Sequence, residues 1–117
     1  MSELAYLETG RRGDASLVRV HGEIDASNVD ELSVGIERAS EHGSIGLVVD
    51  LSETTYLDSA GIALLFRLAE RLRARRQELR LVVPAQAPVR AVLELSGLSA
   101  IAPIDPGEDA TSPGIPD

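Results

Sequence analysis

The chain has 117 residues, 44% of them hydrophobic, and a formal net charge of −8, which suits one globular domain with an acidic surface. Nucleic acids and anionic membranes attract positively charged surfaces, so this balance argues against both as primary partners. The chain has no cysteine, which excludes disulfides, thiolate metal sites and thiol nucleophiles.

The strongly basic side chains are all arginine, and lysine is absent. This excludes the lysine of phosphate-binding loops and Schiff-base chemistry, and it is a compositional sign of a GC-rich bacterial genome. The N-terminus has no basic region followed by an apolar run, and no apolar stretch is long enough to span a membrane. We therefore expect a cytoplasmic protein.

Hydrophobic periodicity divides the chain into alternating strands and helices. Strand segments are short apolar or alternating runs, and helical segments repeat apolar side chains every third or fourth residue. Residues 9–14 and 22–25, rich in glycine and charge, are expected to be a hairpin loop and a turn. The expected strands cover residues 4–8, 16–21, 45–51, 78–83 and 98–104, and the expected helices cover residues 26–40, 59–76 and 88–97.

Particular residues mark the helix ends. Ser27 and Asn28 are candidate caps of the first helix, and either Asp58 or Ser59 can cap the second by accepting from free amides of its first turn. The third helix is expected to end at Gly97, since glycine readily adopts the left-handed conformation that closes a helix.

The order β-β-α-β-α-β-α-β predicts an α/β fold. The β-α-β crossovers favour a mixed, mostly parallel sheet with an antiparallel N-terminal hairpin, and the helices are expected to pack mainly on one face. Residues 1–104 are expected to form the domain. Residues 105–117 are rich in proline, glycine and acid, and are expected to form a disordered tail.

Three segments resemble motifs of one known family. The sequence Asp-Leu-Ser at residues 50–52, followed by Leu-Asp-Ser-Ala-Gly at residues 57–61 and an apolar helix, is similar to the signature of STAS domains, and most of all to that of bacterial anti-sigma factor antagonists. Gly-Glu-Ile-Asp at residues 22–25 resembles the family's Gly-x-x-Asp motif, and residues 89–98 resemble its third helix with a Ser-Gly-Leu ending. The resemblance implies the STAS fold over nearly the whole chain.

The resemblance also implies a function. Such an antagonist binds an anti-sigma factor with a histidine-kinase-like ATPase fold and so releases a sigma factor. The partner is also a serine kinase, and it would inactivate the antagonist by phosphorylating the serine that matches Ser59, while a separate serine phosphatase would reset it. The residues implied in partner contact are Asp25, Asp58, Ser59, Ala60 and Gly61. The chain would be no enzyme, would need no cofactor, and would leave the nucleotide to its partner.

The local residues by themselves favour ordinary capping for Asp58 and Ser59. A helix N-terminus nevertheless accepts a phosphate well, because free amides and the helix dipole face it. A phosphate on Ser59 would therefore change a docking surface and leave the fold intact. Ser52, Thr54 and Thr55 are further hydroxyls on the preceding segment, and whether they are modified stays open.

Other functions are weighed against this one. The nearest is a STAS subunit of another assembly, such as a stress-signalling complex or a lipid-transport system, without a phosphorylation switch. The most remote is a small serine hydrolase using Ser59, His21 and Asp25, although no nucleophile-elbow motif surrounds Ser59. A phospho-accepting role for Asp50, as in receiver domains, is discounted because those domains need a lysine.

The remaining basic residues suggest no separate function. His21 and His42 lack the spacing of metal ligands, so no metal site is expected. The arginines of residues 71–76 are expected to form a solvated helix end that complements the helix dipole.

Overall fold

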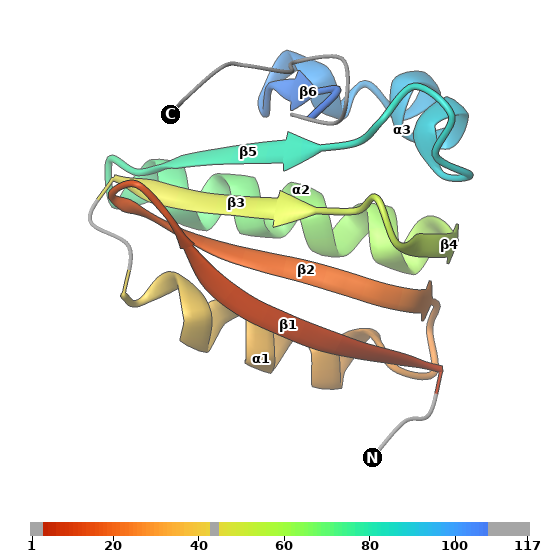
Figure 1. Ribbon diagram of the computed structural model, residues 1–117, viewed down its shortest axis with the longest axis horizontal. Coiled ribbons are helices and arrows are strands. Elements are labelled where there is room, and N and C mark those ends of the chain that lie inside the picture. Colours follow the sequence, from red (N-terminus) through yellow and green to blue (C-terminus); the bar gives the residue numbers. More distant parts are fainter. Residues whose placement is uncertain (1–3, 43–44, 108–117) are drawn as a thin grey trace.

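The computed structural model describes residues 4–42 and 45–107 and shows a sheet packed against helices (Figure 1). In chain order its elements are β1 (Ala5–Arg12), β2 (Ala15–Ile24), α1 (Val29–Ser40), β3 (Gly46–Asp50), β4 (Thr54–Leu57), α2 (Ser59–Ala74), β5 (Glu78–Val82), α3 (Arg90–Ser96), a 3-10 helix (Leu98–Ala100) and β6 (Ile104–Asp105).

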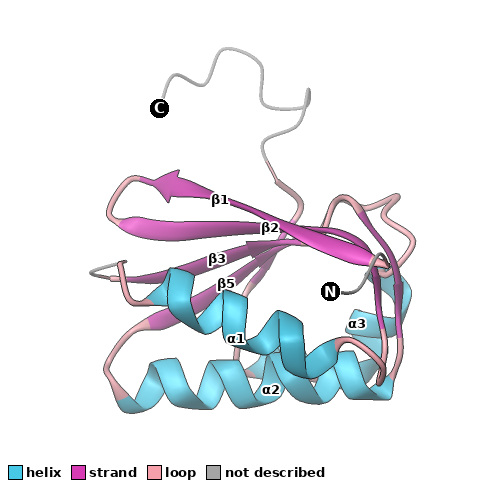
Figure 2. Ribbon diagram, turned by 90° about the horizontal axis from the view of Figure 1, so that it is seen from below, coloured by secondary structure: helices cyan, strands magenta, loops and turns pink. Residues whose placement is uncertain are grey.

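The six-stranded sheet has the order β1-β2-β3-β5-β6, and β4 pairs with the far end of β2. Of the strand pairs in the described residues, β1–β2 is antiparallel and the others are parallel. Figure 2 shows α1 and α2 side by side on one face of the sheet. The predicted mixed sheet, N-terminal hairpin and one-sided helix layer are therefore confirmed.

The core lies between that face of the sheet and the two long helices. All five residues of β3 are buried, as expected of a central strand. From α2, Leu64, Leu65, Leu68 and Leu72 are buried against the sheet, at the three- and four-residue spacing of one helix face. A smaller cluster of Ala15, Val48 and Val82, with Leu17, covers part of the opposite face.

The expected hairpin loop and the expected turn were wrong. β1 and β2 pair without interruption from Ala5↔Gly22 to Arg12↔Ala15, so residues 9–12 and 22–24 belong to strands. The connection is a tight turn at Gly13 and Asp14, where Gly13 has a φ of 62° that suits glycine. Cross-strand pairing overrides the weak strand preference of glycine and charged residues.

The ends of several other elements differ from the sequence prediction by one or two residues, and three differences are larger. α1 begins at Val29, three residues later than expected. Residues 54–57, expected to be loop, form β4, which gains its partner only because β2 extends far enough to pair with it. The expected strand over residues 98–104 is a 3-10 helix followed by the two-residue β6.

The C-terminal part described by the structure still belongs to the sheet. Asp105 pairs in parallel with Val82, and its carbonyl accepts a hydrogen bond of 2.7 Å from the amide of Val83. The expected tail over residues 105–117 therefore overlaps β6 at its first residue, while residues 108–117 lie outside the described part. No described helix has the length and apolar character needed to cross a lipid bilayer.

Candidate functional site

The start of α2 is built around the carboxylate of Asp58. This residue is the N-cap: its Oδ1 accepts hydrogen bonds from the amides of Ala60 at 2.9 Å and Gly61 at 3.2 Å. Two of the amides that a helix start leaves unpaired are thereby satisfied. Of the two candidate caps in the sequence, Asp58 takes the role and leaves the Ser59 side chain uninvolved.

Ser59 is exposed in the first turn of the helix. Within residues 4–42 and 45–107, its hydroxyl makes no hydrogen bond. The first turn of α2 also contains no acidic side chain, so the helix dipole there is balanced only by the capping Asp58. A hydroxyl in this position can be reached by a second protein and can carry a phosphate without displacing any internal contact.

Strand pairing brings Asp25 to the same edge of the sheet. Ile24 of β2 and Leu57 of β4 are register partners in a parallel pair, and the amide of Asp58 donates to the carbonyl of Ile24 at 3.3 Å. Asp25 and Asp58 therefore leave two adjacent strands at the same level. The sequence proposed both residues for one surface, and this register brings their segments together.

The side chain of Asp25 is held by its own loop. Its Oδ1 accepts from the Ser27 hydroxyl at 2.6 Å and from the Ser27 amide at 2.8 Å. These two hydrogen bonds stabilise the carboxylate and lower the pKa of Asp25 below its ordinary value of 3.8. The loop consequently presents a fixed negative charge beside the start of α2.

Asn28 braces this loop, a role that the sequence analysis missed. Its side chain makes no capping bond; instead its Oδ1 accepts from the amide of Asp25 at 3.0 Å and its Nδ2 donates to the carbonyl of Glu23 at 2.8 Å. Asn28 is only 1% exposed. The sequence signal for this role was an asparagine close to the Gly-Glu-Ile-Asp motif of residues 22–25. It was ambiguous, because asparagine is common both as a helix cap and as a residue that bonds to the backbone of a loop.

Gly61 and Ala60 differ from each other in their surroundings. Gly61 is buried, and a Cβ built on it would lie 2.3 Å from Cδ1 of Leu57 and 3.0 Å from Cγ2 of Ile24. Its small size therefore lets α2 approach the ends of β2 and β4, and it adds nothing to an outer surface. Ala60 is half-buried and packs partly on the core, which leaves it at the rim of the surface around Ser59.

The hydroxyls before Ser59 have unequal access. Thr54 is fully buried, and its hydroxyl donates to the carbonyl of Val20 at 2.8 Å, so this hydroxyl fastens β4 to β2. Ser52 is half-buried, and Thr55 is exposed. Of these three, Thr55 offers the most accessible alternative to Ser59.

Asp50 lies at the end of β3, as the sequence suggested. Its side chain is on the face of the sheet opposite to α1 and α2. Its Oδ1 accepts from the amide of Ser52 at 2.8 Å, and its Oδ2 accepts from Nε of Arg19 at 3.0 Å. The hydrogen bond to Asp50 raises the pKa of Arg19. The carboxylate is thus occupied by a loop amide and an ion pair, the structural role that the sequence favoured over phosphorylation.

His21 and Asp25, which a hydrolase using Ser59 would need as partners, interact with other residues. Nε2 of His21 lies 2.9 Å from Oε1 of Glu8, and its ring stacks on Tyr6 with centroids 4.4 Å apart. Asp25 holds Ser27 instead of a histidine. Among the described residues no cluster of three or more acidic, histidine or cysteine side chains could hold a metal ion.

The arginines at the end of α2 form an exposed helix end. Arg71 pairs with Glu37 of α1, and Arg73, Arg75 and Arg76 are exposed. They lie at the other end of α2 from Ser59 and take no part in the site around it.

Comparison with known proteins identifies the fold family. The family described as Mlab, STAS domain, matches residues 7–103 of this chain. A Bordetella bronchiseptica protein, BtrV, described as an anti-sigma factor antagonist, is 27% identical over 93 residues, which cover 80% of this chain and 79% of BtrV.

Two mycobacterial proteins are also similar. Osmosensory protein A of Mycobacterium tuberculosis is 45% identical over 60 residues, but the match covers 51% of this chain and only 37% of that protein's length. The crystal structure of an anti-sigma factor antagonist from Mycobacterium paratuberculosis has a TM-score of 0.77 at 27% identity, covering 90% of this chain and 88% of that one. With nearly its whole folded part matched, this chain belongs to the STAS domain family.

Proposed function

We propose that this protein is an anti-sigma factor antagonist whose binding to an anti-sigma factor is switched off by phosphorylation of Ser59. The observation that carries the proposal is the exposed Ser59 hydroxyl, which lies in the first turn of α2 with no internal partner in the described chain. The similarity to BtrV and to the Mycobacterium paratuberculosis antagonist supports the regulatory role.

The unphosphorylated protein binds the anti-sigma factor through the surface of Asp25, Asp58, Ser59 and Ala60, and this binding displaces the sigma factor. Gly61 contributes indirectly, by seating α2 against β2 and β4. The partner has a histidine-kinase-like ATPase fold and brings the nucleotide, so this chain acts as a binding module and a substrate. Both proteins work in the cytoplasm, where sigma factors act.

Inactivation is a phosphoryl transfer in which the partner is the kinase. The Ser59 Oγ forms a bond to the γ-phosphorus of ATP, the bond to the bridging oxygen of ADP breaks, and the hydroxyl proton passes to a base of the kinase. A serine phosphatase later hydrolyses the phosphoester, returning Ser59 to its free form and releasing inorganic phosphate.

Electrostatics explain why the phosphate would weaken binding without unfolding the domain. It adds roughly −1.5 to −2 charges at neutral pH, close to the carboxylates of Asp25 and Asp58. A partner surface that fits a neutral hydroxyl would then face clustered negative charge. Inside the protein, the start of α2 can accommodate the phosphate, because helix N-termini favour anions.

The first experiment measures binding of Ser59 variants to the purified cognate anti-sigma factor by calorimetry. Ser59→Ala should bind and resist inactivation by ATP, whereas Ser59→Glu should bind at least about tenfold more weakly, since a charge is placed in the interface. Thr55→Ala and Thr55→Glu are matched controls at an exposed hydroxyl four residues earlier, and they should bind like the unmodified protein. Equal binding by Ser59→Glu would contradict the switch.

The second experiment maps the phosphate. Incubation with the partner kinase and ATP, followed by mass spectrometry, should place one phosphate on Ser59. Label on Thr55 with Ser59 unmodified would overturn the site assignment while leaving the binding role open.

A second candidate is an interaction subunit of a sensory assembly without a phosphorylation switch. The observation that favours it is the 45% identity over 60 residues to Osmosensory protein A. In that case neither substitution of Ser59 would change partner binding, and no kinase would be recovered with the protein. A pull-down from the native host, with Ser59→Ala as bait, separates the two candidates.

A further inference from the structure

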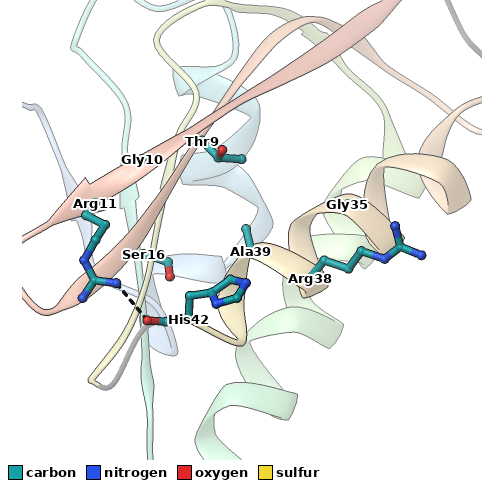
Figure 3. Close-up of a pocket in the computed structure, with 8 residues that line it drawn as sticks. All are labelled: Thr9, Gly10, Arg11, Ser16, Gly35, Arg38, Ala39 and His42. Atoms are coloured by element: carbon teal, nitrogen blue, oxygen red, sulfur yellow. Dashed lines mark hydrogen bonds between the residues drawn. The ribbon is translucent and has the colours of Figure 1, made fainter.

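A cavity of about 560 Å³ lies between the hairpin tip and the C-terminal half of α1. Thr9 and Arg11 of β1 and Ser16 of β2 line one side, and α1 and the residues after it line the other (Figure 3). Ser16 lies near the start of β2 and pairs with Leu47 at the start of β3, whereas Ser59 follows β4, which pairs with the far end of β2. The cavity is therefore at the opposite end of the sheet from the site around Ser59.

The wall of this cavity is positively charged in a protein whose net charge is −8. The charged residues that line it are Arg11 and Arg38, beside the imidazole of His42, and no acidic side chain of the described residues does. Arg11 donates one hydrogen bond of 2.9 Å to the carbonyl of His42, which satisfies an acceptor beyond the end of α1. A guanidinium has five N–H donors, so Arg11 keeps others for a ligand.

Ser16 supplies an independent sign that something binds here. It is 3% exposed, and its buried hydroxyl has no hydrogen-bond partner among the residues that the structure describes. Buried hydroxyls in folded proteins are nearly always paired, because an unpaired one loses its hydration without compensation. Figure 3 shows the Ser16 side chain between Arg11 and His42 on the cavity wall, where an oxygen of a bound molecule could complete its bonding.

We propose that this cavity binds a small organic phosphate. The phosphate group lies at the end formed by Arg11, His42 and Ser16, where a guanidinium offers paired N–H donors that match phosphate oxygens. Arg38 lines the cavity from α1, and Figure 3 shows its side chain directed away from Arg11 and Ser16, so it would contact the polar remainder of a ligand that extends along α1. No phenylalanine, tyrosine or tryptophan among the described residues lines the cavity, so a polyol fits better than a base that would need an aromatic platform.

The test is a titration of the full chain with glucose 6-phosphate, followed by amide chemical shifts in NMR spectra. We expect saturable shifts centred on Thr9, Arg11, Ser16 and His42. Glucose should cause none, because it lacks the anion. Inorganic phosphate should cause the same pattern with weaker affinity, because it lacks the contact with Arg38.

Two substitutions and a matched control make the test specific. Arg38→Gln should weaken glucose 6-phosphate binding roughly tenfold, as expected for a lost charge-assisted hydrogen bond. Arg73→Gln, at an exposed arginine of α2 that does not line the cavity, should bind like the unmodified protein.

Ser16→Ala separates binding from folding. Since its hydroxyl has no partner within residues 4–42 and 45–107, the substitution should leave the unfolding midpoint of the free protein unchanged or raised, while binding weakens. A lowered midpoint with unchanged binding would show that the hydroxyl is structural and would overturn its role in the site.

Two other results would overturn the proposal as a whole. One is the absence of saturation in the millimolar range. The other is a set of shifts centred on Ser59 and the start of α2, which would show that the anion binds at that helix N-terminus. Neither result would bear on binding to the anti-sigma factor, which the Ser59 variants test separately.

Discussion

At the scale of single residues, the site depends on neighbouring polar side chains that have different hydrogen-bonding roles. Asp58 caps the helix, so Ser59 stays unbonded and exposed. Asp25 is held by Ser27, and Asn28 braces the loop from within. The side chains of Asp58, Asp25 and Asn28 are thus engaged in capping and bracing, while the Ser59 hydroxyl makes no hydrogen bond in the described part of the chain.

The pH response of Asp25 tests the geometry of this loop. Its pKa is lowered by the hydrogen bonds from Ser27, so this contribution to stability is fully present above the unfolded-state pKa near 3.8 and is lost as the pH falls through the lower folded-state value. Ser27→Ala should remove the hydroxyl bond and raise the Asp25 pKa toward 3.8.

Carboxyl chemical shifts followed through an acid titration would measure this change. Glu8 of β1, whose pKa is lowered mainly by its hydrogen bond with His21, serves as the control, because Ser27→Ala should leave its titration unchanged. An Asp25 titration that is identical in both proteins would show that the hydrogen bond from the Ser27 hydroxyl is not maintained in solution.

At the scale of elements, the position of Ser59 depends on how β4 and α2 meet β2. β4 pairs with the extended end of β2, and the buried hydroxyl of Thr54 fastens it to the Val20 carbonyl. α2 then starts directly after β4 and approaches closely at Gly61. The exposed hydroxyl is thus held by rigid elements on both sides of the turn.

Gly61→Val tests this close approach. A side chain there would collide with buried Leu57 and Ile24, and overpacking of this kind costs about 1–3 kcal/mol of unfolding free energy. Urea denaturation measures the loss. Ala63→Val, on the exposed side of the same helix, is the matched control and should cost at most about 0.7 kcal/mol, the difference in helix propensity.

Equal losses for the two variants would mean that α2 does not pack on β4 as closely as the structure has it. A large loss for Gly61→Val with anti-sigma factor binding preserved would also show that α2 can shift without disturbing the surface around Ser59.

At the scale of the whole molecule, stability is concentrated in the middle of the sheet. β3 lies between β2 and β5, is buried along its whole length, and contacts the helix layer through Leu47 and Val49. Among the described strands, β1, the two-residue β6 and the short β4 each pair with a single neighbour and form the edges. Edge amides have fewer buried neighbours and open by smaller fluctuations than central ones.

Hydrogen exchange should follow this gradient. The amides of Leu47, Val49 and Leu81 should exchange slowest, near the rate set by global unfolding, and the outward-facing amides of β1 should exchange much faster. Exchange measured by NMR on the unmodified protein tests the order. Protection in β1 equal to that in β3 would indicate that another surface covers this edge in solution.

Much of the site could be predicted from the sequence, because its strand, helix cap and helix are each specified by residues close together in the chain. The apolar run at residues 45–51 and the helical spacing after Ser59 locate a buried strand and a helix, and the Asp-Ser pair locates the cap between them. Local chemistry could not separate the role of Asp58 from that of Ser59, because both residue types cap helices well.

The sequence by itself determined the α/β class, the order of the main elements and the segment that carries Ser59, since these follow from periodicity and from motifs within a few residues. Only the tertiary structure decided that residues 54–57 form a strand, that Gly61 faces inward, and that Ser16 has no hydrogen-bond partner in the described part of the chain and lies beside Arg11 and His42. Each of these depends on contact between segments distant in the chain, and the packing energy of such contacts outweighs local preference.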